Sequence, residues 1–400
     1  MFHVEHSPVE KPARTPLLPT RMLSRLDIYN VRNLEAVRLH GLGRACVLFG
    51  ENGSGKTSVL EAIHMLSLAR SFRASSARSV IRHGEPHCTV YGEVAQAGGA
   101  VRALGVQRET SGMAMLKVAG RPVRNVSSLV AELPVLVINA DSFQLLVGPP
   151  AGRRRFLDWG VFHVEHEFFP AWQRFQRCIK QRNTLLRRDK LAPEELAAWT
   201  RDLASAGERL TACRRRYFDQ LVPVFGEVAA ELLPECEAVG LRFRQGWDAS
   251  QPYEAALAAT AGSDREQGYT HVGPQRAEIA VTVGGHSAAD TLSRGQQKLV
   301  VCALKLAQGH VLRRQERPMT CSYLIDDLPS ELDAIHTRRV CDQLQALGAQ
   351  VFITCIAENA MAGMWPAAAV PPQLFHVEQG RVTPVGPANP GAGDAVEDGQ

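Results

Sequence analysis

Residues 50–57 constrain the fold more than any other segment, because Gly50 to Thr57 fits the nucleotide-binding pattern G-x-x-x-x-G-K-[ST]. An apolar run at 45–49 precedes the loop, and residues 58–69 follow with apolar side chains at helical spacing. A strand, a glycine turn and a helix in this order let backbone N–H groups and a helix N-terminus face phosphate oxygens. The alternative is an ordinary glycine turn before a helix.

The loop predicts a site for ATP and Mg²⁺. We expect Lys56 to reach the β- and γ-phosphates and the Thr57 hydroxyl to hold Mg²⁺. The residues predicted to contact ATP within this loop are Gly50, Glu51, Asn52, Gly53, Ser54, Gly55, Lys56, Thr57 and Ser58.

A magnesium nucleotide site also needs a carboxylate at the end of another buried strand. The apolar run 321–325 leads directly into Asp326 and Asp327. We expect Asp326 to bind Mg²⁺ and Asp327 to position or deprotonate the attacking water, so that Lys56, Asp326 and Asp327 form the catalytic set. The alternative is a solvated acidic pair at a strand end.

Hydrophobic patterns predict an α/β fold. A helical stretch at 334–347 and an apolar strand at 351–354 follow the strand 321–325, which gives a β-α-β unit and favours a parallel sheet. Between residues 25 and 139 the patterns favour antiparallel strands with glycine turns between them, at 88–94, 101–106 and 115–118.

The string Leu292-Ser293-Arg294-Gly295-Gln296 is similar to the signature motif L-S-G-G-Q of ABC ATPases. In that superfamily the signature of one subunit covers the ATP held by another, so the resemblance implies an ATP-dependent homodimer. Ser293, Gly295 and Gln296 are then the residues that bind ATP in trans, and residues 330–333 look like the D-loop at the same interface. Read without the resemblance, Ser-x-x-Gln is also a helix N-cap pattern.

Five further strings resemble the RecF family of bacterial recombination mediators, at 26–34, 67–73, 152–160, 181–183 and 292–308. The resemblance implies a DNA-binding ABC-type ATPase of replication, recombination, repair and the SOS response. It also implies action at single-strand gaps in duplex DNA, where the protein helps RecO and RecR to load RecA. The alternatives are the ATPase subunit of an ABC transporter and an SMC-like structural DNA-organising ATPase.

The chain departs from the patterns that it resembles at three places, and two interpretations of Gln144 stay open. Asp327 stands where many ABC ATPases have a catalytic glutamate, which predicts weak ATP hydrolysis. Thr354 lies near the place of the switch histidine and receives no predicted role, and the loop 273–277 departs from the related family element. Gln144 is either a Q-loop residue or an exposed loop glutamine.

The predicted architecture is an ABC-type P-loop ATPase head with an antiparallel β subdomain and an inserted helical lobe. Prolines at 170, 193, 223, 234 and 252 interrupt the insertion, so we expect a compact lobe rather than a long coiled coil. The predicted parts are an N-terminal extension without order (1–21), the first part of the head (22–139), the helical lobe (140–268), the second part of the head (269–384) and a flexible tail (385–400).

Charge is concentrated in the insertion. Residues 151–220 carry a net charge of +6, whereas the whole chain carries only +4. Clustered arginines bind DNA phosphates without sequence preference. The alternative for each single arginine is an ion pair on a solvated helix face. The predicted DNA contacts are Arg70, Arg73, Arg153, Arg154, Arg187, Arg188, Arg214 and Arg215.

Composition is that of a globular enzyme of the cytoplasm. The chain has 45% hydrophobic residues, no apolar stretch long enough for a membrane span and no signal-peptide pattern at its start. Its nine cysteines are scattered and odd in number, which favours free thiols over disulfides or a zinc site.

Overall fold

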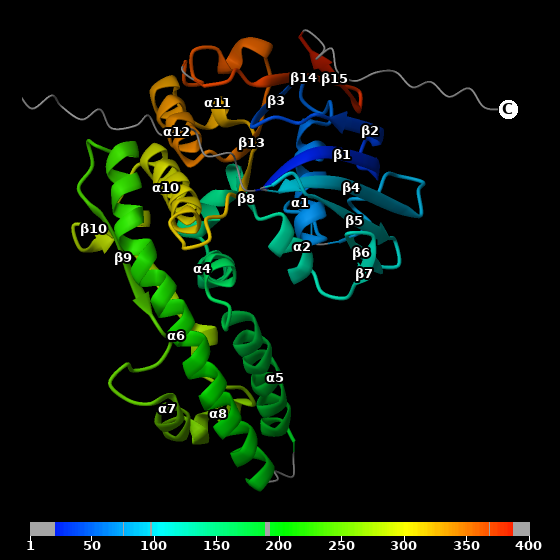
Figure 1. Ribbon diagram of the computed structural model, residues 1–400. Coiled ribbons are helices and arrows are strands. Elements are labelled where there is room, and N and C mark those ends of the chain that lie inside the picture. Colours follow the sequence, from blue (N-terminus) through cyan, green and yellow to red (C-terminus); the bar gives the residue numbers. More distant parts are fainter. Residues whose placement is uncertain (1–20, 75, 97, 189–192, 368, 387–400) are drawn as a thin grey trace, which may run out of the picture.

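The computed structural model describes residues 21–386, apart from 75, 97, 189–192 and 368. Two six-stranded sheets form a head, and a long pair of helices projects from it (Figure 1). The predicted extension and tail lie almost entirely outside the described residues. Their predicted boundaries are wrong by one residue each, because Arg21 begins the first strand and Val385 ends the last.

The first sheet is mostly parallel and carries the nucleotide loop. Its strand order is β15-β14-β3-β13-β12-β8, and only β15 runs antiparallel to its neighbour. The predicted β-α-β unit is confirmed, since β12 pairs in parallel with β13 across helix α12. The strand bounds are β3 (Ala45–Phe49), β8 (Val135–Ile138), β12 (Ser322–Ile325), β13 (Gln350–Cys355), β14 (Gln373–Glu378) and β15 (Arg381–Val385).

The second sheet is antiparallel, as its strand patterns predicted. Its order is β2-β1-β4-β5-β6-β7, and each neighbouring pair is antiparallel. The strand bounds are β1 (Arg21–Val31), β2 (Leu34–His40), β4 (His87–Gln96), β5 (Val101–Glu109), β6 (Ala114–Val118) and β7 (Arg121–Val123).

Helix α1 (Lys56–Leu68) lies between the two sheets and contacts strands of both. Its residues from Ser58 to Ser67 are all buried, so the helix is enclosed on every side, and its Glu61 carboxylate is paired with Arg32. Strand β3 separates two cores. Cys46 and Leu48 face the core around α1, whereas Val47 and Phe49 face the core formed with the long helices, because successive strand side chains alternate.

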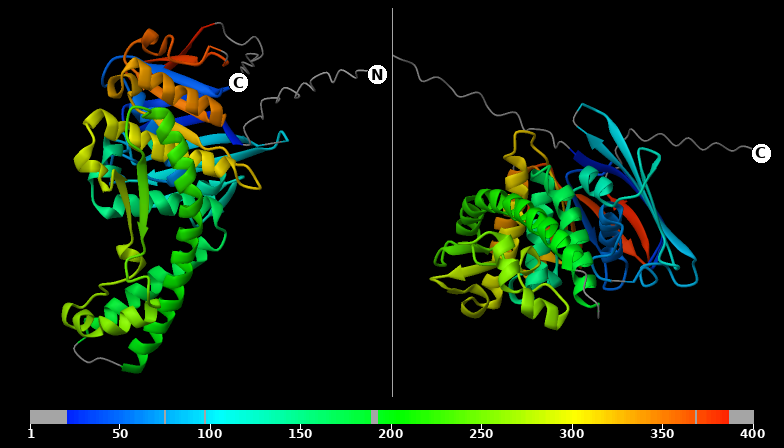
Figure 2. Two further views of the ribbon diagram at one scale, coloured as in Figure 1. Left: turned by 90° about the vertical axis from the view of Figure 1, so that its left-hand side faces the viewer. Right: turned by 90° about the horizontal axis from the view of Figure 1, so that it is seen from below.

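The second core packs helices against the other face of the parallel sheet. It joins α6 with α10 and α12, and shorter helices complete it (Figures 1 and 2). Among the described residues, no helix is both long and apolar enough to cross a bilayer, and the nine cysteines are all free. The helices on this side and at the head are α2 (Ser127–Glu132), α3 (Gln144–Val147), α9 (Ala288–Thr291), α10 (Arg294–Arg313), α11 (Leu328–Glu331) and α12 (Ala334–Leu347).

The insertion is more elongated than the compact lobe that the sequence predicted. Helix α6 has 40 residues, which corresponds to about 60 Å. It continues through Pro223, so the prediction that this proline interrupts the lobe is wrong; neighbouring packing in the core outweighs the lost backbone hydrogen bond. Figure 2 shows α5 and α6 extending side by side away from the head. The helices of the insertion are α4 (Pro150–Val164), α5 (Phe168–Leu186), α6 (Pro193–Leu232), α7 (Tyr253–Ala259) and α8 (Ala261–Gln267).

A small third sheet crosses the predicted boundary at residue 268. Strand β9 (Val239–Arg244) lies inside the predicted insertion and pairs with β10 (Glu278–Val283), which also pairs with β11 (His286–Ser287). The pattern predicted sheet only from residue 269 onward, because β9 alone carries a weak alternation of arginines with apolar residues.

A buried ion pair fixes the far end of the long helices. The Arg182 guanidinium on α5 donates to the Asp264 carboxylate on α8 over 2.7 Å, and the two side chains are 2% and 0% exposed. Asp264 also accepts the backbone N–H of His271, and Arg182 donates to Thr270. Each charge depends on the other, because neither one reaches water.

We predict that Asp264→Ala destabilises the helical insertion by about 3–5 kcal/mol, since it leaves the Arg182 guanidinium buried without a counter-charge. The measurement is urea denaturation followed by far-ultraviolet circular dichroism.

The matched control is Asp202→Ala. Its ion pair with Arg174 also joins α5 to α6, but the two side chains are 47% and 58% exposed, so the expected cost is below about 1 kcal/mol. Equal losses of stability in the two variants would contradict the assignment of the buried pair as the structural anchor.

Candidate nucleotide-binding site

The loop between β3 and α1 has the backbone of a phosphate cradle. Gly50, Gly53 and Gly55 all have positive φ, which glycine adopts without strain. At Gly50 a Cβ atom would lie 2.1 Å from the carbonyl oxygen of Val377, so a larger residue cannot fit. Helix α1 begins at Lys56 directly after this turn, and its first N–H groups therefore point into the loop.

Lys56 lies inside the loop that it was predicted to serve. Its ammonium donates to the carbonyl oxygens of Gly50 and Glu51, over 2.6 and 2.8 Å. Burial lowers the pKa of Lys56, and the nearby carboxylates of Asp327 and Asp326 oppose that shift. The Ser54 hydroxyl is buried without a hydrogen-bond partner. A cation and an unsatisfied hydroxyl in a glycine turn fit a phosphate group.

Asn33 braces the loop from outside, and the sequence predictions did not include it. Its amide nitrogen donates to the carbonyl of Ser54 over 3.0 Å, and its amide oxygen accepts from the Ser58 hydroxyl over 3.0 Å. The backbone N–H of Gly380 donates to the same Ser54 carbonyl. Asn33 lies within one of the strings that resemble the RecF family, but no sequence motif links it to residues 50–58, so its contacts with the loop could not be predicted.

The Asp326 carboxylate meets the Thr57 hydroxyl, as the magnesium prediction requires. The Thr57 hydroxyl donates to it over 2.9 Å, and the Thr354 hydroxyl at the end of β13 donates over 2.7 Å. A carboxylate beside hydroxyl oxygens is a hard-oxygen donor set that fits Mg²⁺. Thr354, which received no predicted role, therefore belongs to the site.

Asp327 has an unusual backbone conformation at the start of α11. Its φ of 57° lies in the left-handed region, which costs energy for a residue other than glycine. Its N–H donates to the Thr354 hydroxyl over 2.9 Å. Thr354 thus contacts both acidic residues and fixes their relative positions.

The signature residues lie on an exposed helix start. Ser293 caps α10 and forms a capping box with Gln296, so the N-cap pattern and the signature pattern coincide. Ser293 and Gly295 are exposed, and within the described part of the chain no hydrogen bond or ion pair joins them to residues 50–58. Lys298 of the same helix forms an ion pair with Glu331 of the predicted D-loop over 2.7 Å.

Two of the arginines predicted to contact DNA point into the protein. Arg153 binds both carboxylate oxygens of Glu278, and this bond raises the pKa of the guanidinium. Arg214 is 4% exposed and binds both carboxylate oxygens of Asp158. These two contacts were misjudged because a run of arginines does not reveal which of them face a distant carboxylate.

The other predicted arginines are more accessible. Arg187 donates to the Gly268 carbonyl and Arg215 donates to the amide oxygen of Gln245. Both arginines are nevertheless exposed. Arg188 forms an exposed ion pair. Arg70 and Arg73 lie exposed just after α1, and Arg154 donates to the Ala277 carbonyl. Gln144 is exposed at the start of α3.

Curated relatives cover almost the whole chain. A family model described as RecF/RecN/SMC N terminal domain matches residues 22–382. The chain is 49% identical over 361 residues to the DNA replication and repair protein RecF of Azotobacter vinelandii, with 90% of this chain and 98% of the relative covered. It is 47% identical to the protein of the same name from Pseudomonas aeruginosa strain PAO1, with 90% and 97% covered.

Solved structures agree with the fold. A structure of the recombination mediator protein RecF with ATP matches with a TM-score of 0.82 and 22% identity, covering 94% of this chain and 100% of the other. An Smc head bound to the C-terminal winged-helix domain of ScpA matches with a TM-score of 0.55 and 15% identity, covering 91% and 96%. The predicted α/β ATPase-head fold is confirmed, and with the identities above the chain belongs to the RecF family of DNA replication and repair proteins.

Proposed function

We propose that this protein is an ATP-dependent DNA-binding protein of replication and recombinational repair. In this proposal ATP joins two heads, the joined heads hold DNA at single-strand gaps, and hydrolysis releases it. The single observation that carries the ATP part is the meeting of Thr57, Asp326 and Thr354 beside the glycine loop. The DNA part rests on the RecF relatives, which are named DNA replication and repair proteins.

The residues of the loop have separate tasks in the proposal. Lys56 exchanges its backbone carbonyl partners for the β- and γ-phosphates, and the N–H groups of residues 53–58 bind their remaining oxygens. Thr57 and Asp326 would hold Mg²⁺, which neutralises charge that develops on the phosphates. Asp327 orients the attacking water, and Thr354 holds both acidic residues in place.

The dimer follows from a site that one chain leaves incomplete. Ser293 and Gly295 present a hydroxyl and helix N-terminal N–H groups to solvent, which is a suitable partner for a γ-phosphate held by a second copy. The ion pair between Lys298 and Glu331 ties this helix to the D-loop, so both elements reach the interface together. Gln296 supports Ser293 from within the capping box.

The cellular role comes from relatives. The solved RecF structures are described as a recombination mediator in the RecFOR pathway. We therefore propose RecR and RecO as partners and RecA loading as the outcome. A transporter ATPase or an SMC-like organiser is disfavoured by the identity to RecF over 361 residues.

The shared ATP site is tested by comparing wild type with Lys56→Met and Ser293→Arg. We expect Lys56→Met to lose ATP binding, because the ammonium is the cation of the loop. We expect Ser293→Arg to bind ATP as a monomer but not to dimerise, because the added side chain fills the space for the partner's γ-phosphate. Analytical ultracentrifugation and nucleotide-binding fluorescence measure the two properties.

The same three proteins test the clamp. DNA retention on beads should require ATP in the wild type and fail in both variants. If all three retain DNA equally with and without ATP, the ATP-gated clamp is wrong.

The role of Thr354 is tested by removing its hydroxyl. Thr354→Val leaves the Asp327 N–H without its acceptor and the Asp326 carboxylate with one donor fewer. We expect a loss of about 1–3 kcal/mol, which corresponds to a hydrolysis rate about 5- to 150-fold lower. ATP affinity should change less. Thr354→Ser keeps the hydroxyl and should restore most of the rate; a rate in Thr354→Val equal to wild type would remove Thr354 from the site.

Hydrolysis by the wild type should be slow, below about 1 s⁻¹ without DNA, because the Asp327 carboxylate lies one methylene closer to the backbone than a glutamate. Asp327→Asn should abolish this activity and preserve the ATP-bound dimer, since it removes only the group that acts on water. Steady-state phosphate release measures the rate, and a transporter-like rate in the wild type would refute the prediction.

A further inference from the structure

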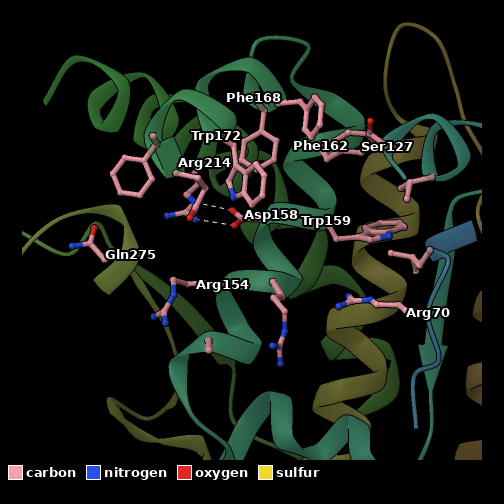
Figure 3. Close-up of a pocket in the computed structure, with 17 residues that line it drawn as sticks. Arg70, Ser127, Arg154, Asp158, Trp159, Phe162, Phe168, Trp172, Arg214 and Gln275 are labelled. Carbon is pink, nitrogen blue, oxygen red and sulfur yellow. Dashed lines mark hydrogen bonds and ion pairs between the residues drawn. The ribbon is translucent and has the colours of Figure 1, made fainter. Parts of the chain in front are cut away.

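Two adjoining cavities lie where the helical insertion meets the head. One, of about 530 Å³, is lined from the head by Leu68, Arg70 and Ser127 and from the insertion by α4 and α5 (Figure 3). The other, of about 300 Å³, shares Leu68, Arg70, Arg155 and Trp159 with it and continues toward α10. Neither contains a residue of the ATP loop.

The larger cavity has an aromatic wall. In Figure 3 the rings of Trp159, Phe162, Phe168 and Trp172 gather on one side of the space, above Arg154 in this view. Phe169 and Trp172 are stacked, with an interplanar angle of 9°. Helical spacing on α4 and α5 brings these rings together, although neither helix carries an aromatic motif. Such a wall favours a flat apolar ligand.

Two residues that line the cavity also contain unsatisfied polar atoms. The amide oxygen of Gln275 and the indole nitrogen of Trp159 are buried without a hydrogen-bond partner. The Gln275 amide nitrogen donates to the carbonyls of Thr270 and Val272, which fixes its oxygen as the free acceptor. Both atoms are closed off from the cavity, and Figure 3 shows Gln275 and Trp159 on opposite sides of the space, so the aromatic rings and the charge of the lining carry the recognition of a ligand.

The lining is strongly cationic. The guanidinium groups of Arg70 and Arg155 have no hydrogen bond or ion pair to any described residue, and that of Arg154 reaches only a backbone carbonyl. In the smaller cavity Lys305 lies over the Phe156 ring without a counter-charge among the described side chains, and burial lowers its pKa to about 8. Of the two carboxylates that line the cavities, Asp158 is neutralised by Arg214 and Asp141 is exposed.

We propose that the joined cavities bind one unpaired nucleotide of a DNA single strand. The base stacks against the aromatic wall, and the flanking phosphates contact Arg70, Arg155 and Lys305. A base inside a duplex is stacked and paired and cannot enter such a pocket, so the site selects single-stranded DNA. This inference rests on the proposed DNA-binding function and names the strand that this part of the protein reads.

The test uses the full-length protein with ATP and three probes. They are a fluorescently labelled oligothymidine strand of fifteen nucleotides, a DNA duplex of the same length, and free thymidine monophosphate. Trp172→Ala and Arg155→Gln should each weaken binding of the single strand by about tenfold, since each removes a stacking plane or a phosphate contact. Duplex affinity should stay within about twofold for Trp172→Ala, which carries no charge. Fluorescence anisotropy measures all affinities.

Two controls separate the pocket from general effects. Trp172→Phe keeps an aromatic ring and should restore most of the single-strand affinity. Arg201→Gln removes an exposed arginine of α6 that lines neither cavity and should change single-strand affinity much less than Arg155→Gln does. As a direct readout, a single strand carrying 5-iododeoxyuridine should cross-link to the aromatic residues of α4 or α5.

Other outcomes overturn the inference. In one such outcome, duplex binding is normal and Trp172→Ala and Arg155→Gln leave single-strand affinity unchanged. In another, cross-links form only outside the cavities. Either result leaves the proposed function intact and assigns the pocket to another ligand, such as a protein segment. Displacement of the strand by an equal concentration of thymidine monophosphate identifies a free-nucleotide site instead. Failure of the wild type to bind any DNA refutes the proposed function together with this inference.

Discussion

The Asp326 carboxylate holds the two halves of the head together at the point where chemistry is expected. Thr57 approaches it from the first half of the chain, and Thr354 approaches it from the strand that separates Asp326 from the nucleotide loop in the sheet. All three lie at carboxyl ends of parallel strands or on the helix that follows one, which is where an open α/β sheet gathers its ligands.

Much of the head could be predicted from local sequence. The run 45–49 and the stretch 334–347 became β3 and α12 with the expected bounds, because each is a single unbroken periodic pattern. The contacts of Thr354, Asn33 and Arg214 could not be predicted, since each depends on partners 21 to 60 residues away or on separate strands. Pro223 shows the same limit, because the core around α6 overrides the local preference of one residue.

The arginines of the insertion divide into two groups that composition alone does not separate. Arg153 and Arg182 form ion pairs with residues of β10 and α8, and Arg214 forms one with Asp158 of α4. Arg214 also holds the loop 273–277, because its guanidinium donates to the Pro274 carbonyl, and Gln275 of this loop lines the aromatic cavity. The buried Arg214 thus helps to position a loop that lines the cavity, whereas the accessible Arg70 and Arg155 give the lining its positive charge.

The length of α6 makes the insertion a lever. One part of this helix packs on α10, whose first residues form the proposed dimer contact, and the rest extends to the far end of the insertion as a single rod (Figure 1). A rotation of about 5° at one end of a rod of about 60 Å displaces the other end by about 5 Å. In the proposed ATP-joined dimer, a small rotation of the head at α10 would thereby become a displacement of several ångströms at the far end of the insertion.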